Sequence, residues 1–193
     1  MSIYLLPPSP ERGAEFAYWE NNFTDEEITK LREQLDALPT ENGWVGEGKY
    51  DEKIRRTQVA WMNLTPESQW VYDRFGFIAR QLNAMYFNLD LFGFSEDFQY
   101  AVYNPDGSHY EWHIDKGSRT PAPRKLSMVM QLSDPSEYEG GDLQFLIGPE
   151  PDVAVKRKGL VYAFPSYVLH RVTPVTKGIR RTLITWLTGP KFR

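Results

Sequence analysis

The chain has 193 residues, no cysteine and a formal net charge of −4. This length suits one domain with its own hydrophobic core. The lack of cysteine excludes disulfides, zinc ribbons, iron–sulfur clusters and thiol nucleophiles. The absence of a block of like charges argues against broad binding to nucleic acid or to an anionic membrane. No apolar run reaches transmembrane length, and the N-terminal segment lacks the basic region of a signal peptide, so we expect a soluble cytoplasmic protein.

The first half of the chain predicts two helices. One is expected to begin at Thr24 or Asp25, where a capping side chain precedes acidic residues, and to end before Pro39. Its apolar residues recur at helical spacing. The second is expected to begin with Thr65 as its cap and to continue to about Tyr86. Both helices are interpreted as scaffold.

Two long loops are expected, one before the second helix and one after a His-x-Asp motif. Residues 40–57 are rich in glycine and charge, and the pair Arg55-Arg56 within them is expected to be solvated. Residues 117–124 contain two prolines and directly follow a His-x-Asp motif. Together these loops favour a groove for an extended peptide.

From residue 98 onward, short strands follow one another between glycine and proline turns. Helices followed by a run of strands indicate an α+β, mainly β fold, in which a two-sheet sandwich or jelly roll is backed by helices. We expect a single domain over residues 1–193, with helical support at about 23–88 and a core at about 98–188. The eight expected strands are roughly 98–103, 109–115, 125–132, 142–147, 152–155, 159–164, 168–173 and 180–188.

Candidate metal ligands lie on two of these strands. The turn at residues 104–107 precedes a strand that ends in His113-Ile-Asp115, and strand alternation points His113 and Asp115 to the same face. His170 lies in a later strand. Two imidazoles and one carboxylate form the facial triad of non-haem Fe(II) oxygenases. Such a triad leaves three positions open for a bidentate 2-oxo acid and O2.

A 2-oxo acid with a second carboxylate also needs a cation. Arg180 follows His170 after a turn, and its guanidinium offers a fork of donors that matches a carboxylate. Arg180 and Arg181 point to opposite faces of the last strand, so only one of them can face the interior, and alternation does not say which.

These motifs resemble the prolyl 4-hydroxylase-like 2-oxoglutarate/Fe(II)-dependent dioxygenases. The match consists of His-x-Asp and a distant His followed by Pro-Val-x-x-Gly-x-Arg, within residues 98–188. The resemblance implies a double-stranded β-helix core, with Fe(II), 2-oxoglutarate and O2 as cofactor and cosubstrates and ascorbate as an optional reductant. It also implies hydroxylation of a C–H bond, with O2 consumed and succinate and CO2 released.

The resemblance assigns roles to individual residues. His113, Asp115 and His170 would be the iron ligands and catalytic centre. Arg180, chosen over Arg181 by its spacing from His170, would bind the 5-carboxylate of 2-oxoglutarate. Tyr103 matches a tyrosine that lines the cosubstrate pocket.

Further matches concern the substrate and the rest of the pocket. Tyr110 matches a tyrosine near the iron, although simple alternation places it on the opposite face unless a bulge intervenes. Trp186 matches a tryptophan near the substrate, and Arg124 a basic residue that touches peptide at the site mouth. Gln131 stands where many family members place a tyrosine or another group that helps to hold the 5-carboxylate. It shares a strand face with Ser127, and both are expected to line the cosubstrate pocket.

Our first hypothesis is therefore a prolyl hydroxylase that acts on a proline-containing peptide or protein, as a monomer or homodimer. A second keeps the chemistry but places it on a free amino acid, another side chain or a small molecule. A third is a non-catalytic jelly-roll binding module. A zinc hydrolase could also use two histidines and one aspartate, but it would have no use for Arg180 in the pocket.

Overall fold

The computed structural model describes residues 14–45, 50–116 and 123–191, and the predicted loop at 117–124 falls mostly outside these ranges. Its larger sheet has the strand order β1-β12-β8-β15-β6-β4-β2, and β5 pairs with β15. The strands are β1 (Ala17–Trp19), β2 (Glu41–Asn42), β4 (Gln58–Met62), β5 (Gly93–Phe94), β6 (Phe98–Tyr103), β8 (Arg124–Gln131), β12 (Val161–Pro165) and β15 (Arg180–Thr188).

A smaller sheet with the order β11-β10-β13-β7-β3 packs against the larger one, and β14 pairs separately with β9. Its strands are β3 (Arg55–Arg56), β7 (His109–His113), β10 (Leu143–Phe145), β11 (Asp152–Val153) and β13 (His170–Val172), and the separate pair is β9 (Tyr138–Gly140) and β14 (Val175–Gly178). The predicted mainly β, α+β jelly roll is thus confirmed. The sequence indicated only a turn between His170 and Arg180, but β14 in this segment pairs with β9 before the chain turns at Gly178, where φ is 66°.

The two predicted helices are present. Helix α1 (Asp25–Asp36) begins at Thr24, whose side chain accepts from the Glu27 backbone while the Glu27 side chain bonds the Thr24 backbone. Helix α2 (Gln69–Leu82) begins later than predicted, because Thr65 and Ser68 form a separate turn. A π-helical turn, η1 (Asn83–Phe87), continues it, and a short 3-10 helix, η2 (Pro135–Glu137), precedes β9. No helix in the described ranges is long and apolar enough to cross a bilayer.

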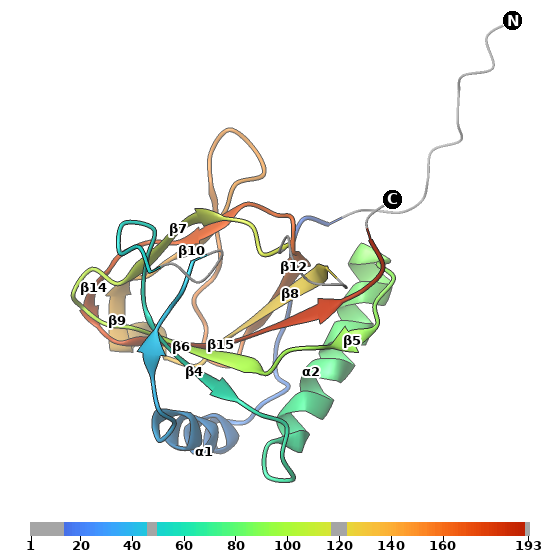
Figure 1. Ribbon diagram of the computed structural model, residues 1–193, viewed down its shortest axis with the longest axis horizontal. Coiled ribbons are helices and arrows are strands. Elements are labelled where there is room, and N and C mark those ends of the chain that lie inside the picture. Colours follow the sequence, from blue (N-terminus) through green and yellow to red (C-terminus); the bar gives the residue numbers. More distant parts are fainter. Residues whose placement is uncertain (1–13, 46–49, 117–122, 192–193) are drawn as a thin grey trace, which may run out of the picture.

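The helices cover one face of the larger sheet, and the smaller sheet lies on the other side (Figure 1). The helix-facing core includes Leu31, Phe75 and Leu183, all fully buried. A second apolar cluster, which includes Val129 and Phe145, lies between the sheets. This second interior also contains buried polar side chains such as Arg180. Alternation along β15 sends Leu183 towards the helices and its neighbours on either side towards the second sheet. The space between the sheets is therefore where a polar site can form.

Candidate active site

Strand pairing brings the two candidate histidines together. Strands β7 and β13 are antiparallel neighbours, and His113 lies directly opposite His170. Their ring centroids are 4.1 Å apart and the rings are tilted by 52°. Two residues far apart in the sequence thus present their imidazoles to the same point between the sheets.

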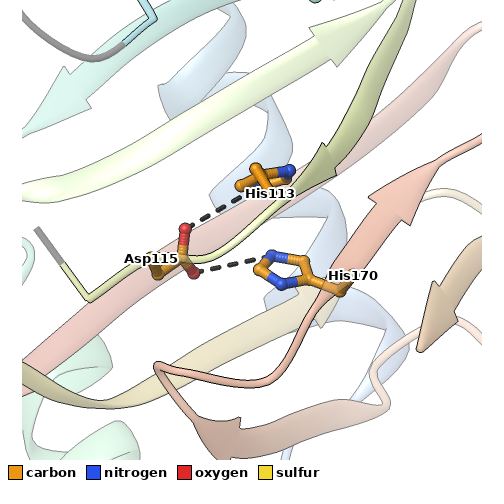
Figure 2. A group of neighbouring side chains, drawn as sticks. All are labelled: His113, Asp115 and His170. Atoms are coloured by element: carbon orange, nitrogen blue, oxygen red, sulfur yellow. Dashed lines mark ion pairs between the residues drawn. The ribbon is translucent and has the colours of Figure 1, made fainter. Parts of the chain in front are cut away.

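Asp115 completes the group (Figure 2). It follows β7, and its backbone N–H donates to the Ser166 carbonyl at 2.9 Å, which holds this segment against the chain that leads into β13. The Nε2 atoms of His113 and His170 each lie 3.6 Å from a different oxygen of the Asp115 carboxylate. The three ligand atoms all lie within 4.8 Å of one another, which is compatible with one shared cation.

Hydrogen bonds fix which nitrogen of each histidine faces Asp115. Nδ1 of His113 lies 2.7 Å from the Glu111 carbonyl, and Nδ1 of His170 lies 2.9 Å from the Val168 carbonyl. A carbonyl oxygen only accepts, so a neutral ring places its hydrogen on Nδ1 and keeps the lone pair on Nε2. In both cases the carbonyl belongs to the residue two positions earlier. This orientation is the one that a metal-binding imidazole needs.

The charge states also suit a divalent metal. Burial, reinforced by His170, lowers the pKa of His113 to about 3, so this ring is neutral near pH 7. Burial alone would raise the pKa of Asp115, but His170 and His113 outweigh it and the pKa falls to about 2. The Trp186 indole N–H is close enough to lower this pKa further, although its geometry falls short of a hydrogen bond. A neutral imidazole beside an ionised carboxylate is a ready metal-ligand pair.

The residues present therefore fit a ferrous ion. Two imidazole nitrogens and one carboxylate oxygen converge from one side, which is the donor set of the facial triad. The His113 and Asp115 side chains retain 14% and 10% exposure, so the group remains open to the outside on one side.

Arg180 is the arginine that faces the interior. It is 3% exposed, and its Nε and Nη1 atoms have no hydrogen-bond partner among the described residues. Its guanidinium lies 5.0 Å from the ring centroid of Tyr103, its partner on β6. Arg181 points the other way and bonds Asp36 of α1 at 3.1 Å. Buried donors without an acceptor are unfavourable, so the guanidinium of Arg180 is suited to bind the carboxylate of a ligand.

Gly141 makes room for this arginine. Its φ is +60°, and a Cβ atom there would lie 2.8 Å from Arg180 Cδ and 2.8 Å from a Val175 methyl group. A glycine is therefore required here for two reasons, because another residue would be strained at this φ and its side chain would displace Arg180.

A bulge decides the position of Tyr110. Tyr110 lies opposite Val172 while His113 lies opposite His170, so β7 contains one more residue than β13 over this interval. The expectation from simple alternation, that Tyr110 faces away, is therefore wrong. Its ring stacks on His113, with centroids 3.4 Å apart and planes 13° apart.

Arg55 is a site neighbour that the sequence did not reveal. It was expected to be solvated, but it is 6% exposed and its guanidinium lies 4.6 Å from the Tyr110 ring centroid. It donates to the Thr57 hydroxyl and the Gln99 side-chain oxygen, both at 2.8 Å. The pairing of β3 with β7 places Arg55 opposite Tyr110, and this non-local contact leaves no pattern in the local sequence.

The remaining cosubstrate candidates lie in two places. The Ser127 hydroxyl donates to Asp115 Oδ2 at 2.8 Å and lies 2.9 Å from the Ser166 hydroxyl, so it supports a metal ligand. Gln131 lies farther along β8, where its Nε2 is 2.6 Å from the Tyr138 hydroxyl oxygen.

The substrate candidates Arg124 and Trp186 contact each other. The Arg124 guanidinium lies 3.6 Å from a ring centroid of Trp186, and its Nε donates to Glu96 at 2.7 Å. Trp186 pairs with Ser127 across β15 and β8. Both side chains therefore lie on the Asp115 side of the interior.

Comparison with known proteins agrees with this geometry. Residues 98–188 match the family described as the 2OG-Fe(II) oxygenase superfamily. A PKHD-type hydroxylase of Acidovorax ebreus is 33% identical over 175 residues, which cover 83% of this chain and 72% of the relative. A second PKHD-type hydroxylase, of a Synechococcus strain, is 35% identical, but the match covers only 42% of this chain and 36% of the relative.

Two solved structures share the fold. A Pseudomonas putida prolyl-4-hydroxylase superposes with a TM-score of 0.73 at 20% identity and covers 92% of this chain and 94% of its own. A prolyl hydroxylase of Trichoplax adhaerens, in complex with a hypoxia inducible factor peptide fragment, has a TM-score of 0.75 at 17% identity and covers 91% and 84%. The similarity spans both the helices and the sandwich, and the histidine–aspartate–histidine group lies within the matched family region. The chain thus belongs to the 2OG-Fe(II) oxygenase superfamily, whose iron and 2-oxoglutarate this interior is built to receive.

Proposed function

We propose that this 2-oxoglutarate/Fe(II)-dependent hydroxylase acts on a proline residue of a peptide or protein. The observation that carries the oxygenase chemistry is the convergence of His113, Asp115 and His170 within 4.8 Å. Support for proline comes from the solved structures of similar fold, two of which are described as prolyl hydroxylases.

Each side chain would have a defined task. His113, Asp115 and His170 would hold Fe(II), which supplies O2 activation coupled to the decarboxylation of 2-oxoglutarate. Arg180 would bind the distal carboxylate and so orient the 2-oxo group towards the metal ligands. Tyr103 would shield the guanidinium from water with its ring face.

The substrate would approach from the Arg124 side. The guanidinium there is held by Glu96 on one side and by the Trp186 ring on the other, so it is fixed in place. Its remaining donor capacity suits a backbone carbonyl of an extended peptide. The rings of Trp186 and Tyr110 would border this approach, Trp186 against the Arg124 guanidinium and Tyr110 between His113 and Arg55.

Replacement of His113 by alanine tests the oxygenase assignment. We expect His113→Ala to lose at least about a thousandfold in succinate formation, because two remaining ligands hold the metal poorly. Circular dichroism should show that the fold is intact. The matched control is His109→Ala on the same strand, whose ring bonds the Gly107 carbonyl instead. Retention of full activity by His113→Ala would contradict the assignment.

The substrate is tested separately. Proline-containing peptides incubated with Fe(II) and 2-oxoglutarate should gain one oxygen atom on proline, as read by tandem mass spectrometry. Oxidation of only free amino acids, other side chains or small molecules would instead support the second hypothesis, with the same chemistry on another substrate.

A further inference from the structure

A buried cation of the smaller sheet lies close to the metal ligands. Arg55 of β3 is 6% exposed, and no carboxylate in the described part of the chain forms an ion pair with it. Its donors reach neutral acceptors, namely the Thr57 hydroxyl and the Gln99 side-chain oxygen at 2.8 Å and the Trp44 carbonyl at 3.3 Å. A charge buried among neutral partners is costly, so packing alone does not account for this guanidinium.

The contacts of Arg55 hold its guanidinium in one place. Gln99 belongs to β6 of the larger sheet, so the hydrogen bond from Arg55 Nη2 joins the two sheets. A Cβ atom at Gly43 would lie 2.6 Å from Arg55 Nε and 2.5 Å from Thr57 Oγ1, so only a glycine allows the backbone to come this close. The Gly43 N–H donates to the Thr57 carbonyl at 2.9 Å, which maintains the close approach.

The guanidinium held in this way contacts Tyr110. Arg55 Cζ lies 4.6 Å from the centroid of the Tyr110 ring, which is within the range of a cation–π interaction. The same ring stacks on His113, with centroids 3.4 Å apart and planes 13° apart. The described residues provide no hydrogen bond to the Tyr110 hydroxyl. The ring is therefore held by the groups that pack against it, and Arg55 is the charged one among them.

The imidazole of His113 needs a second restraint. Its Nδ1 lies 2.7 Å from the Glu111 carbonyl, and one hydrogen bond leaves the ring free to tilt about that contact. The lone pair of Nε2 lies in the ring plane, so a metal ligand requires a fixed plane as well as a fixed nitrogen. The stacked ring of Tyr110 supplies this second restraint.

We propose that Arg55 is a positioning residue for His113 and that it acts through Tyr110. The cation holds the tyrosine ring against the imidazole, and the ring keeps the Nε2 lone pair directed at the metal. This inference rests on the proposed function because it concerns the metal site, but it depends neither on 2-oxoglutarate nor on proline. It gives β3, which lies far from the ligand motifs in the sequence, a part in assembling the metal centre.

Calorimetric titration of the metal-free protein with Mn(II) tests the inference without turnover. Arg55→Gln removes the charge and keeps a polar side chain, and it should weaken Mn(II) binding about tenfold, the size of a desolvated cation–π contact. The visible absorption of the Co(II)-loaded protein, which depends on the arrangement of the ligands, should change as well. Thermal unfolding of the metal-free variant checks its fold.

A second variant keeps the test decisive if Arg55→Gln does not fold. Thr57→Val preserves the size of the side chain but removes the acceptor of Arg55 Nε. It should weaken Mn(II) binding by a smaller factor than Arg55→Gln, because the hydrogen bond to Gln99 remains.

A double-mutant cycle shows whether Arg55 acts through the tyrosine ring. Tyr110→Leu removes the ring and should itself weaken Mn(II) binding. In this background Arg55→Gln should change the affinity by less than about twofold, because the group that transmits its effect is gone.

Arg56→Gln is the matched control. Arg56 is the next residue of β3, but its guanidinium reaches Glu52 at 2.9 Å and the Asp106 carbonyl at 2.8 Å near the surface. Its replacement should leave the Mn(II) affinity and the Co(II) spectrum unchanged.

The possible results separate this inference from the proposed function. Equal Mn(II) affinity in Arg55→Gln and the original protein would overturn the role of Arg55 and leave the oxygenase proposal intact. A full loss from Arg55→Gln in the Tyr110→Leu background would also overturn it, since Arg55 would then act on the fold rather than through the ring. No binding of Mn(II) by the original protein would contradict the proposed function itself.

Discussion

The side chain of Asp115 is held by two serines, one on β8 and one directly after its neighbour β12. Ser127 on β8 donates to Oδ2, and the Ser166 hydroxyl lies 2.9 Å from that of Ser127. Both serines are fully buried. Asp115 follows a strand of the smaller sheet, but its side chain is held by Ser127 of the larger sheet. The hydrogen bond from Ser127 fixes the direction of Asp115 Oδ2.

Removal of this support should weaken the metal site without removing a ligand. We expect Ser127→Ala to lower the affinity for Mn(II) about tenfold, the lower end of the range for groups that orient metal ligands. Calorimetric titration with Mn(II) measures the change. The control is Ser136→Ala, which changes an exposed serine of η2 whose hydroxyl donates to Asp134 at 2.6 Å. Equal affinity in Ser127→Ala and the original protein would show that the hydrogen bond does not orient the carboxylate.

At the scale of elements, one ion pair joins the two helices that cover the larger sheet. Arg74 of α2 contacts both carboxylate oxygens of Glu27 on α1 at 2.5 Å, and Glu27 also accepts from the Thr24 backbone at the start of α1. The Arg74 hydrogen bond, followed by the one from Thr24, lowers the pKa of Glu27 from 4.5 to about 2. The same carboxylate therefore caps the start of α1 and anchors α2 to it.

This pair predicts a specific dependence of stability on pH. A folded-state pKa below the unfolded value stabilises the fold above pH 4.5, and this contribution is lost as the pH falls from 4.5 towards 2. Glu27→Gln should lower the free energy of unfolding by about 1 kcal/mol at pH 7, since the pair is partly exposed. The difference should shrink as the pH falls below about 4.5.

Urea denaturation at a series of pH values measures this effect. Glu26→Gln serves as the control, because Glu26 is an exposed carboxylate in the same helical turn. A Glu27→Gln penalty that stays constant between neutral and acidic pH would show that the ion pair is not its source.

At the scale of the whole molecule, the site joins the two sheets. The metal ligands come from the smaller sheet and the segment after β7, while Arg180 and Ser127 belong to the larger sheet. A cation bound by these ligands would tie β7, the segment after it and β13 together, and the hydrogen bond from Ser127 to Asp115 connects this group to the larger sheet. The assignment of the chain to a single domain, and the choice between monomer and homodimer, stay predictions.

Metal binding should therefore stabilise the entire fold. With Mn(II) at about one hundred times its dissociation constant, the free energy of unfolding should rise by about 2.7 kcal/mol, because the unfolded chain does not present the converged ligands. Thermal unfolding with Mn(II) and with a chelator measures the shift. His170→Ala should show no shift, and an equal shift in that variant would place the stabilising metal elsewhere.

The sequence by itself determined the parts of this protein that follow from local patterns. His-x-Asp at a strand end could be recognised because strand alternation points both side chains to one face. His170 and Arg180 were identified by their spacing in the motif shared with the family, since alternation alone left Arg180 and Arg181 open. Thr24 as a helix cap and the succession of short strands followed from the same kind of local rule. The mainly β fold and the iron ligands were therefore predictable.

The tertiary structure decided what depends on the pairing of distant strands. A bulge between β7 and β13 turned Tyr110 onto His113, and the pairing of β3 with β7 buried Arg55 above that tyrosine. The separate β9–β14 pair brought Tyr138 to Gln131. No local period encodes such contacts, because register and bulges between strands far apart in the chain are set by packing of the whole sandwich.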